Sequence, residues 1–241
     1  MKNQTIALVL VVVLASSIVS LITVVQAAKS CHLRELDLCL ASVLVFAQSP
    51  QNNKVTENDI NKQCHYFGDT ENCFKNYTNV CATKSQRLLI DFVSDGVLQT
   101  FKDYCTPGND IRRLTIKHGE CLNLQRAKTN KCLIDLQAAI ERTTQDSRNW
   151  RDRPKTLCCA YDRYRACMFN IIEPACGREA VDLGEIFVRS LFSRAVQVTC
   201  SKYKHTSSVC KAVLPQRGTI PKGPRSSSVI SRLMSTITGI Q

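Results

Sequence analysis

Fourteen cysteines in 241 residues constrain the fold of this chain more than any other feature. A constant offset of 95 residues relates two sets of three cysteines, namely Cys64, Cys81 and Cys105 in the first and Cys159, Cys176 and Cys200 in the second. Looser counterparts complete each set, with Cys31, Cys39 and Cys73 in the first and Cys121, Cys132 and Cys167 in the second. A set of six cysteines that occurs twice predicts two copies of one disulfide framework.

The sequence does not choose the partners within each set, because six cysteines allow about fifteen connectivities. Cys158 and Cys210 are left over by the repeat. By elimination we expect these two cysteines to pair with each other. The alternative is a bridge between the adjacent residues Cys158 and Cys159, which requires a strained ring. In either case all fourteen cysteines are expected in disulfides.

The N-terminus has the pattern of a secretory leader. Lys2 precedes an apolar run from Ile6 to Val25, and small residues end the run at Ala27. This pattern predicts a signal peptide over residues 1–27. The run is also long enough to span a bilayer, so an uncleaved anchor is the alternative. Both interpretations place the remaining chain outside the cytosol, where thiols oxidise, and we expect a secreted protein.

Hydrophobic spacing predicts an all-α fold. Nine glycines and seven prolines punctuate the whole chain, and apolar residues recur every three or four positions instead of alternating. We expect two tandem helical units, over residues 28–107 and 108–214, followed at 215–241 by a basic linker and a short amphipathic helix. In the first unit, Leu89 and Tyr104 mark an inward stripe on a helix expected over 83–105.

The repeat extends from cysteines to core residues. A second long helix is expected over 178–200, and at the same offset Leu88 matches Leu183 and Phe92 matches Phe187. The other helices are predicted from shorter patterns.

A first helix is expected over about 30–48, and Thr56 with Asp59 resembles a capping box. One long helix is expected from 110 to about 144, and Pro174 should end the helix that contains Cys167.

The charge of the chain is concentrated at its C-terminal end. Residues 201–241 contain seven basic residues and no aspartate or glutamate, within a chain whose formal net charge is +12. This segment can bind an anionic glycan or a membrane surface, or it can be a solvated end. The short helix after Ser226 can dock on the body, insert at a membrane or remain disordered. Nucleic acid is not an expected partner of a secreted chain without a recognisable reading module.

Two further surface sites are suggested by short patterns. Asn76-Tyr77-Thr78 is a glycosylation sequon in a polar stretch. A second stretch mixes basic and aromatic residues, as sites for sulfated glycans or anionic headgroups do. Its candidate anion-binding residues are Arg148, Arg151, Arg153, Lys155, Arg163 and Arg165. Nearby aspartates dilute this stretch, and ordinary surface packing is the alternative interpretation.

No pattern indicates catalysis, a metal site or a cofactor. The four histidines, His32, His65, His118 and His205, are scattered without the spacing of a zinc helix or an obvious partner. The segment 158–167 resembles the active-site helix of secreted phospholipases, but Asp162 stands where the catalytic histidine would be. The acid-base mechanism of these phospholipases requires that histidine as its base, so we expect no enzyme.

The six-cysteine helical unit, the adjacent Cys158 and Cys159, and the Ser-rich C-terminal helix resemble secreted cysteine-rich arthropod proteins. These are similar to the 27 kDa hemolymph glycoprotein family and to related nematode and arthropod domains of unknown function. The resemblance implies an all-helical extracellular glycoprotein without known catalysis. We therefore expect a noncatalytic binding protein or a carrier of an apolar small molecule. The alternative is a venom or defence effector that engages membranes or receptors through its basic C-terminal region.

Overall fold

The computed structural model describes residues 31–32, 34–39, 54–145, 152–190, 194–226, 231–232 and 235. Its helices with described bounds are α3 (Glu57–Cys81), α4 (Lys84–Cys105), α5 (Asp110–Leu124), α6 (Arg126–Gln145), α7 (Arg153–Cys176), α8 (Arg178–Ser190), α9 (Arg194–Cys200), α10 (Ser208–Val213) and the 3-10 turn η2 (Gly223–Arg225). Residues 34–39 are also helical, and none of the described residues lies in a strand. The predicted all-α class is confirmed. The predicted leader lies outside the described residues.

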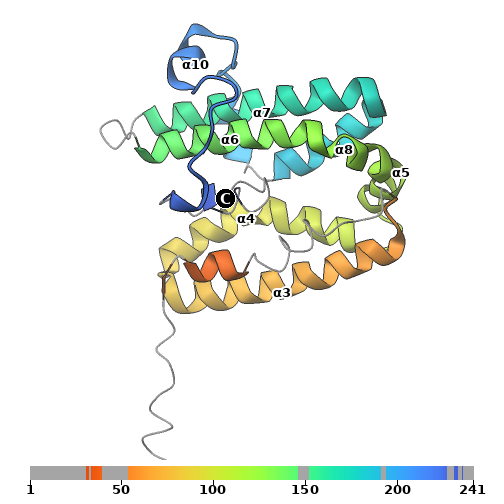
Figure 1. The fold of residues 1–241 in the computed structure, drawn as a ribbon. Helices are drawn as coiled ribbons and strands as arrows, with labels where there is room; N and C mark the ends of the chain where they lie inside the picture. Colours follow the sequence, from red (N-terminus) through yellow and green to blue (C-terminus); the bar gives the residue numbers. More distant parts are fainter. Residues whose placement is uncertain are drawn as a thin grey trace, which may run out of the picture.

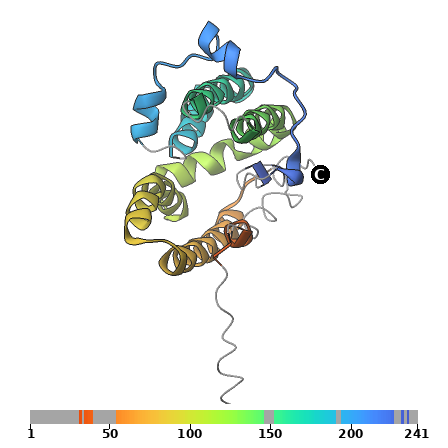
Figure 2. The same ribbon diagram turned by 90° about the vertical axis from the view of Figure 1, so that its left-hand side faces the viewer.

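The helices form two groups joined by α5 (Figures 1 and 2). The first group consists of α3 and α4, which pack against each other at one end of the molecule. The second group consists of α6 to α10 at the other end, where α6 packs against α7. Helix α5 contacts α4, α6, α7 and α8, and α8 also contacts α4. In the second group α7 is central, since it packs against α5, α6, α8, α9 and α10.

Local capping explains where the helices of the first group begin. The side chain of Thr56 accepts a hydrogen bond from the Asp59 amide, and the Asp59 carboxylate accepts one from the Thr56 amide. Thr83 and Gln86 form the same reciprocal pair at the start of α4. Each box satisfies two groups that a helix N-terminus leaves unpaired. The predicted capping box and the predicted helix over 83–105 are confirmed.

Two other predicted boundaries are wrong, and a third lies partly outside the described residues. The helix expected over 110–144 divides at Gln125 into α5 and α6. Pro174 does not end α7, which continues to Cys176 and stops before Gly177, whose φ of 82° only glycine adopts readily. The helix expected over 178–200 is described as α8 and α9, with residues 191–193 outside the described ranges. The part of the first predicted helix beyond residue 39 also lies outside them.

Seven disulfides include all fourteen cysteines. Those of the first set are Cys31–Cys81, Cys39–Cys73 and Cys64–Cys105. Those of the second set are Cys121–Cys176, Cys132–Cys167 and Cys158–Cys200. In both sets the first cysteine pairs with the fifth, the second with the fourth and the third with the sixth. The repeat is therefore one of connectivity as well as spacing, and no bridge joins the two sets.

The predicted bridge between Cys158 and Cys210 is wrong. Cys158 pairs with Cys200, and Cys159 pairs with Cys210. Consecutive residues on a helix point about 100° apart, so the adjacent cysteines of α7 reach different neighbours. One of them meets α9 and the other meets α10. The structural counterpart of Cys64 is therefore Cys158, although the constant offset pointed to Cys159.

The second group contains most of the buried core. One cluster centres on Cys159, Ala160 and Cys210, and another on Ile172 and Val181. The first group has a smaller aromatic cluster. The Phe67 and Phe101 ring centroids lie 4.3 Å apart, and the Tyr104 ring meets Phe187 edge-on at 6.0 Å. That last contact joins the two groups. None of the helices in the described ranges is both long and apolar enough to cross a bilayer.

The inward stripe predicted for α4 is wrong in its N-terminal half. Leu89 is 64% exposed, and its neighbour Leu88 is 72% exposed. Tyr104, at the other end of the stripe, is buried, and burial raises the pKa of its hydroxyl. Its hydroxyl donates a hydrogen bond to Gln63. Helix α4 is thus packed at its C-terminal end and open at its N-terminal end.

Candidate anion-binding site

A basic pocket of about 340 Å³ lies between α7 and the chain that follows α9. Its cationic lining residues are Arg163 from α7, Lys211 from α10 and Arg217 from the segment after α10, and His205 also lines it. The remaining lining comes from Thr206 and residues 214–216. Among the described residues, no aspartate or glutamate lines this hollow. We call it the basic pocket.

Two disulfides fix the chain that builds the basic pocket. Cys158–Cys200 holds α9 against α7, and Cys159–Cys210 holds α10 against the same helix. The Ser207 hydroxyl caps α10 by accepting a hydrogen bond from the Cys210 amide. Leu214, just after α10, is buried in the cluster around Cys159. The chain that lines the pocket is therefore held both by covalent bonds and by apolar packing.

Arg163 is a buried cation in the lining of the basic pocket. The residue is 6% exposed, and its Nη1 donates to the Pro215 carbonyl at 2.7 Å while its Nη2 lies 3.3 Å from the Asp135 carbonyl. Burial lowers the pKa of this guanidinium, the charge of Asp135 opposes that shift, and the nearby charge of Arg217 adds to it. Two like charges thus repel each other across the pocket. A bound anion would relieve that repulsion.

Asp162 positions His205 at the edge of the basic pocket. Its Oδ2 accepts a hydrogen bond from the His205 amide at 2.8 Å and lies 2.7 Å from Nδ1 of the same residue. Burial by itself would raise the pKa of this carboxyl, but the two hydrogen bonds from His205 and the nearby charge of Lys204 hold it below its usual value. The prediction that His205 lacks a partner is wrong, because the partner is 43 residues away in sequence.

The segment after α10 is fastened at two further points. The Gly218 amide donates to Asp135 Oδ1 at 2.8 Å. Farther along, the carboxylate of Glu141, which is 2% exposed, accepts hydrogen bonds from the amides of Lys222 and Gly223 and from the Ser231 hydroxyl. Figures 1 and 2 show this segment passing along α6 towards the first group. Its described part is docked on the body, and Arg217 belongs to it. Of the C-terminal helix only residues 231, 232 and 235 are described, so docking of that helix stays a prediction.

A second hollow, of about 400 Å³, has Asp162 in its lining and carries two carboxylates beside its three cations. Glu185 pairs there with Arg165 and with Arg189, and Asp162 lies 3.7 Å from the Lys204 ammonium. Because each carboxylate already neutralises a cation, this hollow offers an anion less than the basic pocket does.

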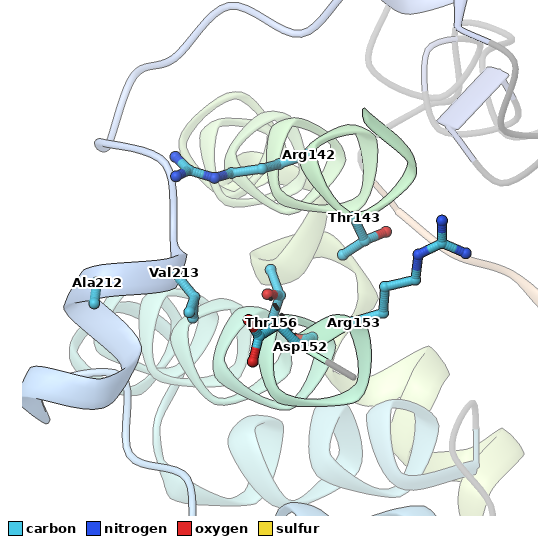
Figure 3. A pocket seen from close by; sticks show the side chains of 7 residues that line it. All are labelled: Arg142, Thr143, Asp152, Arg153, Thr156, Ala212 and Val213. Carbon is cyan, nitrogen blue, oxygen red and sulfur yellow. Dashed lines mark hydrogen bonds between the residues drawn. The ribbon is translucent and has the colours of Figure 1, made fainter. Parts of the chain in front are cut away.

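A third hollow, of about 170 Å³, lies where α6 ends and α7 begins (Figure 3). Two arginines line it, but Figure 3 shows the guanidinium groups of Arg142 and Arg153 extending away from each other. Asp152 also lines the hollow and accepts a hydrogen bond from Lys155 at 2.7 Å, which raises the pKa of that lysine. The two arginines therefore do not converge on a common ligand.

The described members of the predicted anion-binding set do not line one common pocket. Arg148 and Arg151 lie outside the described residues. Of the others, Arg163 lines the basic pocket, Arg165 lines the second hollow and Arg153 the third. Arg165 also lies over the Phe169 ring at 5.3 Å.

The predicted glycosylation site lies on the surface. Asn76 is exposed on α3. Its modification stays a prediction.

Sequence reasoning placed Lys211 and Arg217 in a basic segment but could not assign them to a pocket. The signal was the absence of acidic residues over 201–241. Comparison of the chain with protein-family models, with curated proteins and with solved structures gave no match. The resemblance to hemolymph glycoproteins therefore stays a prediction, and the function has to be argued from the geometry alone.

Proposed function

We propose that this is a secreted, noncatalytic binding protein whose ligand is an anion carrying sulfate or phosphate groups. The observation that supports the proposal is the basic pocket, in which Arg163, Lys211 and Arg217 converge without a lining carboxylate in the described part of the chain. Guanidinium groups bind sulfate and phosphate oxygens through paired hydrogen bonds. The disulfide framework supports an extracellular location, where such bonds persist.

The pocket favours a charged ligand over an apolar one. Each of these three hollows combines charged side chains with apolar ones, and in the basic pocket three cations lie beside Leu214 and Pro215. A carrier of apolar molecules would instead need a mostly apolar lining. The carrier function stays a prediction, and mass spectrometry of small molecules that copurify with the native protein would test it.

Titration calorimetry with a short heparin oligosaccharide tests the proposal. Replacing Lys211 and Arg217 by glutamine should weaken binding at least about tenfold, because a hydrogen bond to a charged group contributes roughly 1.5–3 kcal/mol. The control is the double change Lys102→Gln and Lys128→Gln, which removes the same charge from two exposed positions outside the basic pocket. Binding by this control should match the wild type.

A separate arm identifies the source of the anion. Vesicles containing phosphatidic acid present phosphate on a membrane, whereas heparin presents sulfate on a soluble glycan. Binding to either probe that requires Lys211 and Arg217 supports the proposal and names the source. Equal loss in the control variant would show that the net charge of the chain, and not the basic pocket, attracts the probe. No binding to either probe at low salt would contradict the proposal.

A further inference from the structure

The internal repeat allows the same helical face to be compared in two settings. In α8, residues at positions i, i+3, i+7 and i+10 share one face. They are Ala180, Leu183, Phe187 and Ser190. In α4 the residues at the offset of 95 are Ser85, Leu88, Phe92 and Asp95. We call these the α8 face and the α4 face.

The α8 face is covered at its N-terminal end by α5 and α7 and at its C-terminal end by α4 of the first group. Ala180 is fully buried and Leu183 is 1% exposed. The Phe187 ring meets Tyr104 of α4, and a Cβ added at Gly96 of α4 would lie 3.4 Å from the Ser190 carbonyl. The backbones therefore approach closely at Gly96. Phe187 and Ser190 of the α8 face therefore lie at the interface between the two groups.

The α4 face is uncovered. Leu88 is 72% exposed and Phe92 is 61% exposed, and Ser85 and Asp95 are exposed as well. Leu89, 64% exposed, extends the apolar area beside Phe92. In repeat proteins each unit buries its apolar face against a neighbouring unit, and end units need a covering of some kind. The α4 face thus repeats the apolar residues that are covered in the α8 face, and none of the described elements covers them.

We infer that a second copy of this chain covers the α4 face, with the two α4 helices antiparallel about a twofold axis. The charges beside the apolar residues favour this arrangement. Lys84 lies at the N-terminal end of the face, and Asp91 and Asp95 lie at its C-terminal end, all of them exposed. In an antiparallel pair, Lys84 of each copy faces Asp95 of the other copy. A symmetric pairing of this kind closes on itself and gives a dimer.

Sedimentation velocity of the full-length, disulfide-bonded protein over a wide concentration range tests the inference. The wild type should form a concentration-dependent dimer. Replacing Leu88 and Phe92 by glutamine should weaken it about a hundredfold or more, because each copy loses two buried apolar side chains. Both residues are exposed in the monomer, so folding should be retained. The control Ile220→Gln changes another apolar residue that is 85% exposed, and it should leave the dimer intact.

A charge exchange tests the antiparallel geometry. Lys84→Asp and Asp95→Lys should each weaken the dimer, and combining them should restore it, because the facing pair then has its signs reversed together. A wild type that stays monomeric at every concentration would overturn the inference. So would a dimer that the Leu88 and Phe92 changes leave unaffected. Binding of a monomeric wild type to phosphatidylcholine vesicles through these residues would assign the face to a membrane and also overturn it.

Discussion

The first and second helical groups have the same disulfide connectivity but differ in burial. Each joins its first cysteine to its fifth, its second to its fourth and its third to its sixth. The second group adds Cys159–Cys210, and both of these cysteines are fully buried. Cys31, in the first group, is exposed. The disulfide connectivity therefore defines the topology of a group. In the second group, the chain that follows α9, which we call the added chain, determines which surfaces are covered and which form pockets.

The added chain in the second group does two things at once. It covers α7 with α10 and Leu214, and it supplies two of the three cations of the basic pocket. No comparable segment covers α4 within the described ranges. Variants that separate the contribution of the bridges from that of the added chain therefore test this comparison.

The largest expected effect comes from removing the extra bridge. Cys159→Ala with Cys210→Ala opens a link between residues 51 positions apart, and Cys31→Ala with Cys81→Ala opens one between residues 50 apart. The chain-entropy model gives nearly the same loss for both, about 4 kcal/mol. Because Cys159 and Cys210 lie in the buried core, their removal should cost more. Unfolding by denaturant measures both free energies, and equal losses would show that the burial difference between the groups has no energetic weight.

The junction between the groups is sensitive to one methyl group. A Cβ at Gly119 of α5 would lie only 2.7 Å from the Cβ of Val55, so the backbone of one or the other must move. Gly119→Ala should therefore destabilise the protein by about 1–3 kcal/mol. Gly68→Ala is the matched control, because nothing lies within 4 Å of its added methyl group and alanine favours a helix. A neutral Gly119→Ala, measured by thermal unfolding, would mean that the two groups are not tightly joined there.

Glu141 tests whether the added chain is held by specific contacts. Glu141→Gln replaces one carboxylate oxygen by an NH2 group, so the one remaining oxygen cannot accept all the hydrogen bonds that Lys222, Gly223 and Ser231 donate to the two oxygens of Glu141. The docked segment should lose about 1–2 kcal/mol of local stability. Hydrogen exchange should accelerate in residues 216–226 and remain unchanged in α3 and α4. Uniform acceleration across the chain would indicate global destabilisation instead of release of this segment.

The smallest expected effect concerns acid stability. The pKa of Asp162 lies below its ordinary value in the folded protein, so its contribution to stability is present above the unfolded pKa and is lost as pH falls through the folded one. Wild-type stability should therefore decline below about pH 4, and less steeply in Asp162→Asn. Denaturation midpoints measured between pH 2 and pH 6 provide the comparison. Identical pH profiles would show that the contact with His205 does not contribute to stability.

Local signals predicted the starts of helices well, and distant contacts could not be predicted. The reciprocal pair of Thr56 and Asp59 lies within one turn, so the sequence contains all of it. Arg163 was expected on an anion-binding surface, but its burial depends on Pro215, 52 residues away. The choice between Cys158 and Cys159 depends on the direction in which each side chain leaves α7, which spacing alone does not show.

Disulfide mapping by partial reduction and stepwise alkylation tests the central claim most directly. The account predicts three bridges with identical connectivity in each set, with Cys158 joined to Cys200 and Cys159 joined to Cys210 as the additional bridge. Stepwise alkylation is needed because no protease separates the adjacent cysteines of α7. Any bridge between a cysteine of residues 31–105 and one of residues 121–210 would contradict the account.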